Sequence, residues 1–405
     1  MNVLIIQPGF PVEIPYFVRG LSQAGARVLG VGDTPQRSLP RVAKQGLSAY
    51  LQVGNLWNAG KLIDALRRWD LPLKLHRVEC LWEAAMELTA EVRVAFGLPG
   101  LDPDQTQLFR DKDAMRNALD RAGIRNPRHA RAASDGEILA AAAKVGFPLI
   151  VKPVAGAGSA NTYKLGDERE LRSLLPRLRG VAEVVVEEFI SGTEYTFDTV
   201  CAGGEILFHN VELYRPDMLS ARSREDVSPQ TISLRDLSAS HFQRARAMSE
   251  QVIAALGYRT GYTHMEWFHT PDDEVVFGEI AARPPGGCSG ELANRTCDFD
   301  VYRAWGNALV RGHLRQQVER RYNVAMVFKR AQGHGRIQRI EGLRAIERRL
   351  GPSLLRHELL PIGARRRNWK QTLISDGYVM LRHPQLDKTL ALADEVADTL
   401  QLYAG

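Results

Sequence analysis

Short apolar runs alternate with amphipathic segments along the first hundred residues. The apolar runs have the length of buried strands, and the segments between them repeat apolar residues at helical spacing and end near glycine. This alternation is typical of a doubly wound α/β domain, in which helices join parallel strands. The predicted strands are residues 3–7, 26–33 and 50–53, and the predicted helices are residues 14–23, 60–68 and 83–96.

The pattern changes after residue 110, where antiparallel hairpins follow a small α+β segment. Apolar spacing after Asp111 predicts a helix with Lys112 in its first turn. Capping-box sequences at residues 134–137 and 167–170 predict two further helix starts. Residues 215–228 are polar, contain three arginines and are expected to form a loop that faces solvent, with a cleft-lining loop as the alternative. The other predicted elements are helices at residues 135–145, 168–179 and 242–256 and strands at residues 183–189, 195–201 and 205–211.

A lysine and a glycine-rich segment follow a short apolar strand within residues 147–161. Lys152 ends the predicted strand, and Gly156, Gly158 and Ser159 lie in the segment after it, where backbone N–H groups can approach an anion. This combination indicates polyphosphate binding, and the alternative is a flexible hairpin with a surface lysine. The segment matches neither a Walker loop nor a dinucleotide fingerprint.

Two further predicted strands, residues 262–269 and 274–281, flank the turn sequence Pro-Asp-Asp and are expected to form a hairpin. A two-residue loop at 272–273 would place Glu266 directly opposite Glu279. Carboxylates so placed repel each other, and a divalent cation such as Mg²⁺ would compensate. A slipped register would instead point one carboxylate to solvent.

Composition narrows the class of protein. Of 405 residues, 44% are apolar and 25% charged, which is typical of a globular chain of two or three domains. The net charge of +6 is uneven, because residues 311–370 hold 16 Lys/Arg against 4 Asp/Glu. Few aromatic residues interleave with these cations, so a nucleic-acid surface is not indicated. A solvated face or subunit contact is favoured for this region, and an anion-facing surface is the alternative.

No apolar run approaches membrane-spanning length, and the first residues lack a basic leader region. The four cysteines are scattered and form no CxxC pair, so neither a zinc site nor a disulfide framework is indicated. We therefore expect a cytoplasmic protein without nucleic-acid or membrane partners.

Five motifs occur in an order that resembles the ATP-grasp superfamily: the helix lysine, the strand lysine with its glycine loop, VVVEEFISGTEY, the glutamate hairpin and EIAARPPGG. The resemblance covers roughly residues 98–312, and the flanking regions resemble carbamoyl-phosphate-synthase-like and amino-acid-ligase members. It implies an ATP-grasp fold with an N-terminal doubly wound domain and a C-terminal α+β region. The implied domains are residues 1–105, 106–312 and 313–405, with a lid subdomain at about 125–190 and a central antiparallel sheet at about 191–312.

The resemblance also implies binding of ATP with Mg²⁺ or Mn²⁺, and it assigns roles to single residues. The implied nucleotide-binding residues are Lys112, Lys152, Gly156, Gly158, Ser159, Glu187, Glu188, Phe189, Ile190 and Glu194, with the backbone from Glu188 to Ile190 near the adenine and Glu194 on the ribose. The implied metal ligands are Glu266 and Glu279, and the implied catalytic residues are Arg283 and Lys152. His264 is interpreted as a structural histidine rather than a base.

The implied activity is an ATP-dependent, ADP-forming ligase that joins a small-molecule carboxylate to an amine through an acyl phosphate. Two alternatives stay open: a carboxylase of biotin or purine type, and a nucleotide-binding regulatory module without turnover. Many members carry an asparagine ligand where this chain has Ala281, which leaves the coordination of a second metal open. Any assembly is expected to be a homodimer.

Overall fold

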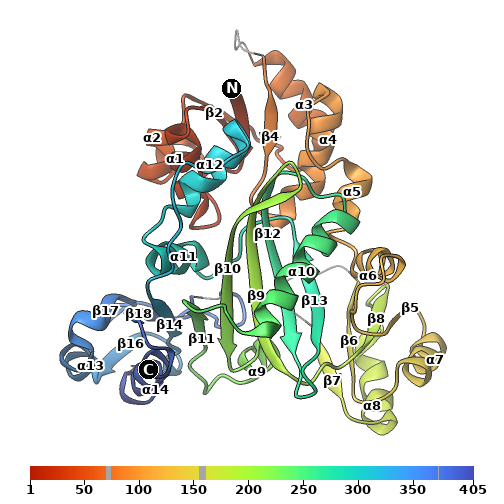
Figure 1. The fold of residues 1–405 in the computed structure, drawn as a ribbon, viewed down its shortest axis with the longest axis vertical. Coiled ribbons are helices and arrows are strands. Elements are labelled where there is room, and N and C mark those ends of the chain that lie inside the picture. Colours follow the sequence, from red (N-terminus) through yellow and green to blue (C-terminus); the bar gives the residue numbers. More distant parts are fainter. Residues whose placement is uncertain (70–73, 155–160, 373) are drawn as a thin grey trace.

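The computed structural model describes residues 1–69, 74–154, 161–372 and 374–405. Figure 1 shows an N-terminal domain at one end of the molecule, a long central sheet, a small lid beside the β13 edge of that sheet and a C-terminal region that includes the opposite edge. The glycine-rich segment with Gly156, Gly158 and Ser159 lies outside the described residues.

The N-terminal domain is built on a parallel sheet of order β3-β2-β1-β4, which confirms the predicted doubly wound alternation. Strands β1 and β2 are almost fully buried, as their continuous apolar runs require. The sequence did not reveal β4, because a three-residue strand with two charged residues carries no apolar period. The elements are β1 Asn2–Ile6, α1 Ile14–Gln23, β2 Arg27–Gly32, α2 Arg41–Gly46, β3 Ala49–Gln52, α3 Ala59–Arg68, β4 Arg77–Glu79, α4 Met86–Phe96 and α5 Pro103–Gln107.

A close helix crossing joins this domain to a much later part of the chain. Helix α12 (Val301–Arg311) packs on α1, and a Cβ atom at Gly20 would lie 2.3 Å from the backbone of Tyr302. A Cβ atom at Gly306 would lie 2.7 Å from the Gly20 carbonyl oxygen. Only glycine allows backbones to approach so closely, so these two positions fix the N-terminal domain against the rest of the molecule.

The lid has an antiparallel sheet of order β5-β8-β6-β7 flanked by helices. Both capping boxes are confirmed: the Ser134 hydroxyl accepts from the Glu137 N–H at 3.3 Å, and the Asp167 carboxylate accepts from the Glu170 N–H at 2.8 Å. The elements are α6 Lys112–Arg121, β5 His129–Ala132, α7 Asp135–Val145, β6 Leu149–Pro153, β7 Tyr163–Leu165, α8 Glu168–Leu178 and β8 Val184–Glu188.

The central sheet has the order β13-β12-β9-β10-β11-β14-β18-β17. Its last three strands come from the C-terminal region, so the predicted boundary after residue 312 does not separate two sheets. Helix α10 covers one face of the sheet beside the lid (Figure 1). The elements are β9 Thr193–Ala202, β10 Glu205–Arg215, α9 Met218–Ser223, β11 Gln230–Ser233, α10 Ser240–Ala255, β12 Gly261–His269, β13 Val275–Ala281, α11 Ser289–Cys297, β14 Asn323–Phe328, β15 Gln332–Gly333, β16 Ile337–Glu341, α13 Leu343–Leu350, β17 Leu354–Leu359, β18 Gly377–His383, α14 Leu386–Thr399 and β19 Gln401–Ala404.

The β12–β13 hairpin pairs Glu266 with Glu279, as predicted, but the predicted two-residue loop is wrong. The strands end with His269 opposite Val275, so the loop is longer and the register there differs by one residue from the prediction. A β-bulge after Glu266 then shifts the register by one residue, which restores the predicted carboxylate pair.

Candidate active site

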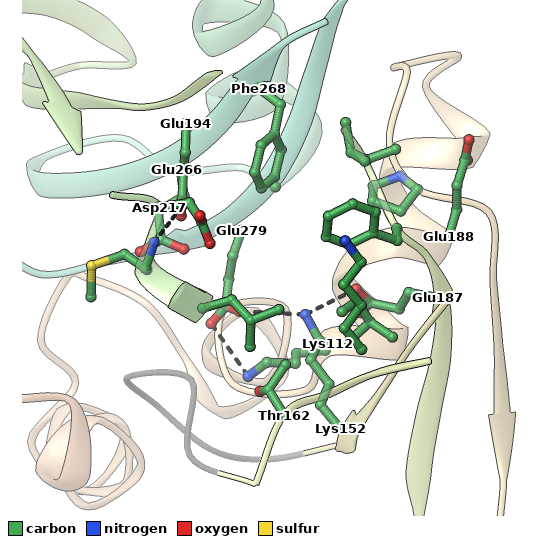
Figure 2. A pocket seen from close by; sticks show the side chains of 18 of the residues that line it. Lys112, Lys152, Thr162, Glu187, Glu188, Glu194, Asp217, Glu266, Phe268 and Glu279 are labelled. Atoms are coloured by element: carbon green, nitrogen blue, oxygen red, sulfur yellow. Dashed lines mark hydrogen bonds and ion pairs between the residues drawn. The ribbon is translucent and has the colours of Figure 1, made fainter. Parts of the chain in front are cut away.

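A cavity of about 370 Å³ lies between the lid and the end of the central sheet formed by β9, β12 and β13 (Figure 2). Its walls come from α6, β6, β7 and β8 of the lid, from β9 and α9, and from the glutamate hairpin, which are segments far apart in the sequence. The residues predicted for the site that line it are Lys112, Lys152, Glu187, Glu188, Phe189, Ile190, Glu194, Glu266, Glu279 and Arg283.

The lid side of the cavity holds a compact ion cluster around Glu187. Arg116 binds its carboxylate with two hydrogen bonds, of 2.9 and 2.7 Å, and the Lys152 Nζ atom lies 3.0 Å from it. Burial alone raises the pKa of Glu187, but the charges of Arg116 and Lys152 outweigh it and lower the pKa to about 2. The carboxylate therefore stays ionised and holds Lys152 in place.

Both lysines also reach across the cavity. The Nζ atoms of Lys112 and Lys152 lie 3.3 and 3.9 Å from the two carboxylate oxygens of Glu279 (Figure 2). Lys112 lies in the first turn of α6, as predicted, and its side chain is almost fully buried. Two lysines thus converge on the hairpin carboxylate from opposite elements, α6 and β6.

The stretch from Glu188 to Ile190 forms the edge of the cavity, and Figure 2 shows the Glu188 side chain turned away from the cavity centre. Its carboxylate instead accepts hydrogen bonds from the Arg128 backbone N–H and the Arg125 guanidinium, at 3.1 and 3.2 Å. The N–H groups of Glu188 and Phe189 donate within the lid. The Glu188 carboxylate and these two N–H groups are therefore engaged within the lid, while the stretch itself still lines the cavity edge.

The sheet side of the cavity carries carboxylates in excess of cations. Glu194 accepts a hydrogen bond of 2.7 Å from the Met218 N–H, and burial and the nearby charge of Glu266 raise its pKa to about 8. Glu279 and Asp217 line the same wall. Together with Glu266, four carboxyl groups therefore line this wall.

His264 lies between Glu266 and the buried Asp198. Its Nδ1 atom lies 2.6 Å from the carboxylate of buried Asp198, and its Nε2 atom lies 3.6 Å from Glu266. Burial alone lowers the pKa of His264, but Asp198 and Glu266 raise it to about 10. Its cross-strand neighbour on β13 is Ala281, the position at which the family pattern has asparagine. His264 is therefore held in a buried polar network, as expected of a structural histidine.

Arg283 reaches the cavity from the chain just after β13, and its partner comes from the N-terminal domain. Its Nε atom donates to the Glu83 carboxylate at 2.9 Å, and Arg110 forms an ion pair with the same carboxylate. No local pattern pointed to Glu83, because it lies 200 residues from Arg283. Arg116 was also missed, although its spacing of four residues from Lys112 places both on one helix face.

The segment 215–228, predicted as a loop, contains the short helix α9. This helix begins after Asp217, whose carboxylate caps it by accepting a hydrogen bond of 2.9 Å from the Ser220 N–H. Asp217, Met218 and Leu219 line the cavity, so the interpretation that this segment only faces solvent is wrong.

The C-terminal region holds the other end of α9. Arg330 donates to the carbonyl oxygens of Ala221 and Arg224, at 2.9 and 2.5 Å, and its guanidinium lies 4.4 Å from the ring centroid of Trp369. Some of the basic residues in the range 311–370 therefore make contacts inside the molecule rather than facing solvent, because Lys329 and Arg330 are both buried.

The hairpin carboxylates offer oxygen ligands to a metal. Among the described residues, no group of three or more His, Cys, Asp or Glu side chains is arranged to hold a metal ion. Mg²⁺ and similar cations need only one or two carboxylates when phosphate oxygens and water complete their shell. Glu266 and Glu279, paired across β12 and β13, have the right chemistry for that role.

Residues 117–299 match the family model of the ATP-grasp domain. This chain carries an ATP-grasp domain. The fold of the entire chain agrees, because the L-amino acid ligase of Bacillus licheniformis superposes with a TM-score of 0.78 at 20% identity, over 100% of this chain and 98% of that one. The N5-carboxyaminoimidazole ribonucleotide synthetase of Thermotoga maritima superposes with a TM-score of 0.73 at 17% identity, over 100% and 99%.

The L-arginine-specific L-amino acid ligase of Bacillus subtilis is similar to this chain in sequence. The two are 28% identical over 218 residues, which cover 52% of each chain. The match therefore spans about half the length of that relative. In addition, no helix within the described residues is long and apolar enough to cross a bilayer.

Proposed function

We propose that this ATP-grasp protein is an ADP-forming ligase that joins a carboxylate to an amine. One observation supports the proposal most strongly: two lysines face a carboxylate-rich wall across one cavity of about 370 Å³. Such a cavity can take the triphosphate on the lysine side and its divalent cation on the carboxylate side. The amino acid ligases named above support this reading by relationship and by fold.

The charges of the cavity walls suggest how ATP and its metal ion would bind. Lys112 and Lys152 would bind the phosphates, and the metal would bind to Glu266 and Glu279. The ion pairs of both lysines with Glu279 support this assignment, because they place cations beside this carboxylate within the cavity. A bound Mg²⁺ would supply charge neutralisation for the phosphates, and the carboxylate-only ligand set is suited to it.

The other nucleotide contacts would lie toward the cavity edge. The backbone from Glu188 to Ile190 would meet the adenine, and Glu194 would accept from the ribose hydroxyls. Glu187 would act through Lys152, because its own carboxylate is already occupied by Arg116 and Lys152.

The proposed reaction has two steps. An oxygen of the substrate carboxylate attacks the γ-phosphorus, the bond to the β–γ bridging oxygen breaks, and ADP leaves. The amine nitrogen then attacks the acyl carbon, the bond to the phosphate oxygen breaks, phosphate leaves, and the nitrogen loses a proton. Arg283 would stabilise the charge on the transferred phosphoryl group, and Glu83 would hold Arg283 in position.

Steady-state release of ADP tests the proposal. The protein is incubated with ATP, Mg²⁺ and pairs of amino acids, and ADP and phosphate are measured together with any dipeptide by mass spectrometry. A ligase releases ADP and phosphate in equal amounts only when both a carboxylate and an amine are present. Release that depends on bicarbonate would indicate the carboxylase alternative, and ATP binding without release would indicate a regulatory module.

A further inference from the structure

Three aromatic side chains cluster on the N-terminal domain. The ring centroids of Phe10 and Trp57 lie 4.9 and 5.3 Å from that of Trp82, with interplanar angles of 82° and 73°. These are favourable edge-to-face arrangements. Nevertheless Phe10 and Trp57 are 55% and 52% exposed. An exposed group of rings held together in this way is a surface for binding an apolar group.

The cluster lies at the edge of the sheet where ligands of open α/β sheets bind. Phe10, Trp57 and Trp82 follow strands β1, β3 and β4, respectively, so all three lie at the carboxyl ends of parallel strands. The chain begins at the end of this domain far from the central sheet (Figure 1). The strands therefore run toward the ATP-grasp domain, and their carboxyl ends face it.

Two loops of this edge are attached to the chain segment around Arg283. Trp82 directly precedes Glu83, whose carboxylate accepts from Arg283 at 2.9 Å. Three residues after Phe10, the Glu13 carboxylate accepts from the Glu291 N–H at 3.2 Å, in the first turn of α11. Trp82 is thus one residue away from the partner of Arg283, and Arg283 lines the cavity where the phosphoryl group would be transferred.

The charge of these loops indicates what kind of group they bind. The three loops that carry the rings, residues 7–13, 53–58 and 80–83, contain two glutamates and no lysine or arginine, whereas the remaining loop of this edge, residues 33–40, contains one arginine, Arg37. A phosphorylated substrate, such as a ribonucleotide, needs cationic or backbone donors for its phosphate. Loops that present aromatic rings and carboxylates are suited instead to an uncharged apolar group.

We infer that the carboxylate substrate carries an aromatic or large aliphatic side chain, which packs against Phe10, Trp57 and Trp82. This inference rests on the proposed ligase function and adds the substrate class to it. It separates this chain from ATP-grasp relatives named for ribonucleotide substrates, because the three loops that carry the rings offer no lysine or arginine to a ribose phosphate.

The test compares Trp57→Ala with the wild type in ADP release, using phenylalanine, leucine, alanine and phosphoserine as carboxylates with a fixed amine. The expected result is a preference of the wild type for phenylalanine and leucine, and a rise of about tenfold in their KM in the variant, with the KM values for alanine and ATP unchanged. Phe10→Ala should act in the same direction. Val94→Ala removes a comparably exposed side chain, 63% exposed on α4, and should change nothing.

Equal loss for all carboxylates, no loss, or a wild-type preference for phosphoserine would overturn the inference. A change of oligomeric state in Trp57→Ala, measured by sedimentation and without a change of selectivity, would also overturn it, because the rings would then contact a second copy of the chain.

Calorimetric titration separates this inference from the ligase proposal. If no carboxylate supports ADP release, phenylalanine and alanine are titrated into the protein with Mg²⁺ and ADP present. Tighter binding of phenylalanine that is lost in Trp57→Ala would support the inference even though the ligase proposal has failed. Equal binding of both amino acids would overturn it.

Discussion

The two walls of the cavity use charge in opposite ways. On the lid side, buried Glu187 is matched by Arg116 and Lys152, with contacts of 2.7 to 3.0 Å. On the sheet side, Glu279 is paired with both lysines, but burial and the charge of Glu266 raise the pKa of Glu194 to about 8, and the nearby His264 does not offset them. A matched cluster stabilises the folded chain, whereas an excess of like charge costs stability until a ligand compensates it. The comparison predicts that the lid cluster supports the fold and that the sheet wall supports the chemistry.

The largest expected effect is on turnover when the sheet wall loses a carboxylate. Glu279→Gln should lower Mg²⁺-dependent ADP release by about 10²–10³-fold, because it removes a proposed metal ligand. The same change relieves repulsion with Glu266 but also removes the ion pairs of Glu279 with Lys112 and Lys152, so the melting temperature without ligands should change little. ADP release and thermal unfolding measure the two effects.

The matched control is Glu274→Gln on the same hairpin, where the side chain is 55% exposed. It should leave both turnover and stability close to the wild type. If Glu279→Gln unfolds the protein, or turns over at the wild-type rate, the two walls do not differ in the way proposed.

The reverse result is expected for the lid cluster. Glu187→Gln leaves the buried Arg116 and Lys152 without their carboxylate and should lower the free energy of unfolding at pH 7 by about 3 kcal/mol, since the pKa of Glu187 falls from 4.5 to about 2 on folding. Because the folded-state pKa is the lower one, this stabilisation is present above about pH 4.5 and is lost as the pH falls toward 2. Denaturant unfolding between pH 3 and pH 7 should therefore show a flatter acid limb in the variant.

Glu168→Gln is the control for the lid, because Glu168 forms an exposed i,i+4 pair with Arg172. Such surface pairs contribute about 0.5 kcal/mol or less. An equal loss of stability in the two variants would mean that the Glu187 cluster is no more than a surface ion pair.

The next effect concerns Lys152, which contacts both walls. Lys152→Ala leaves Glu187 with both hydrogen bonds from Arg116, so the chain should still fold. The stabilisation of about 2.7 kcal/mol that ATP gives at 100 times its Kd should then largely disappear. Thermal unfolding with and without Mg²⁺ and ATP measures it, with Lys144→Ala on the exposed face of α7 as the control. A full ATP-dependent shift in folded Lys152→Ala would remove this lysine from the nucleotide site.

The smallest expected effect lies at the cavity edge, where Arg330 holds α9. Arg330→Met should loosen Asp217, Met218 and Leu219 and raise the KM for ATP by about three- to tenfold, with kcat nearly unchanged. Arg339→Met is the control, because Arg339 stacks on Tyr403 at the same distance of 4.4 Å. A fall in kcat at constant KM would show that Arg330 does not act through α9.

The elements that could be predicted from the sequence are those with local signals. The spacing of apolar residues predicted the alternating strands and helices of the N-terminal domain. The spacing of capping-box residues predicted where α7 and α8 begin. The Glu266–Glu279 pair was predicted correctly although the turn was not, because the longer turn and the β-bulge after Glu266 cancel in register. A bulge leaves no clear period in the sequence, so neither error could be seen there.

The tertiary contacts of the predicted site residues could not be predicted from the sequence. Glu83 meets Arg283 only because the N-terminal sheet directs its carboxyl edge at the hairpin, and Arg330 meets α9 only because the C-terminal strands extend the central sheet. Such contacts depend on tertiary packing, which a single sequence does not encode in any local spacing. Arg116 is different, since its position four residues after Lys112 already placed it on the same helix face.

The transfer of oxygen from the substrate carboxylate to phosphate tests the central claim most directly. A carboxylate that supports ADP release is labelled with ¹⁸O in both oxygens, and the phosphate released during turnover is analysed by mass spectrometry. An acyl phosphate predicts one ¹⁸O atom in each phosphate released, with Mg²⁺ required and with the label absent in Glu279→Gln. Phosphate that carries oxygen only from ATP and water would contradict the account, because the cavity would then hydrolyse ATP without activating the carboxylate.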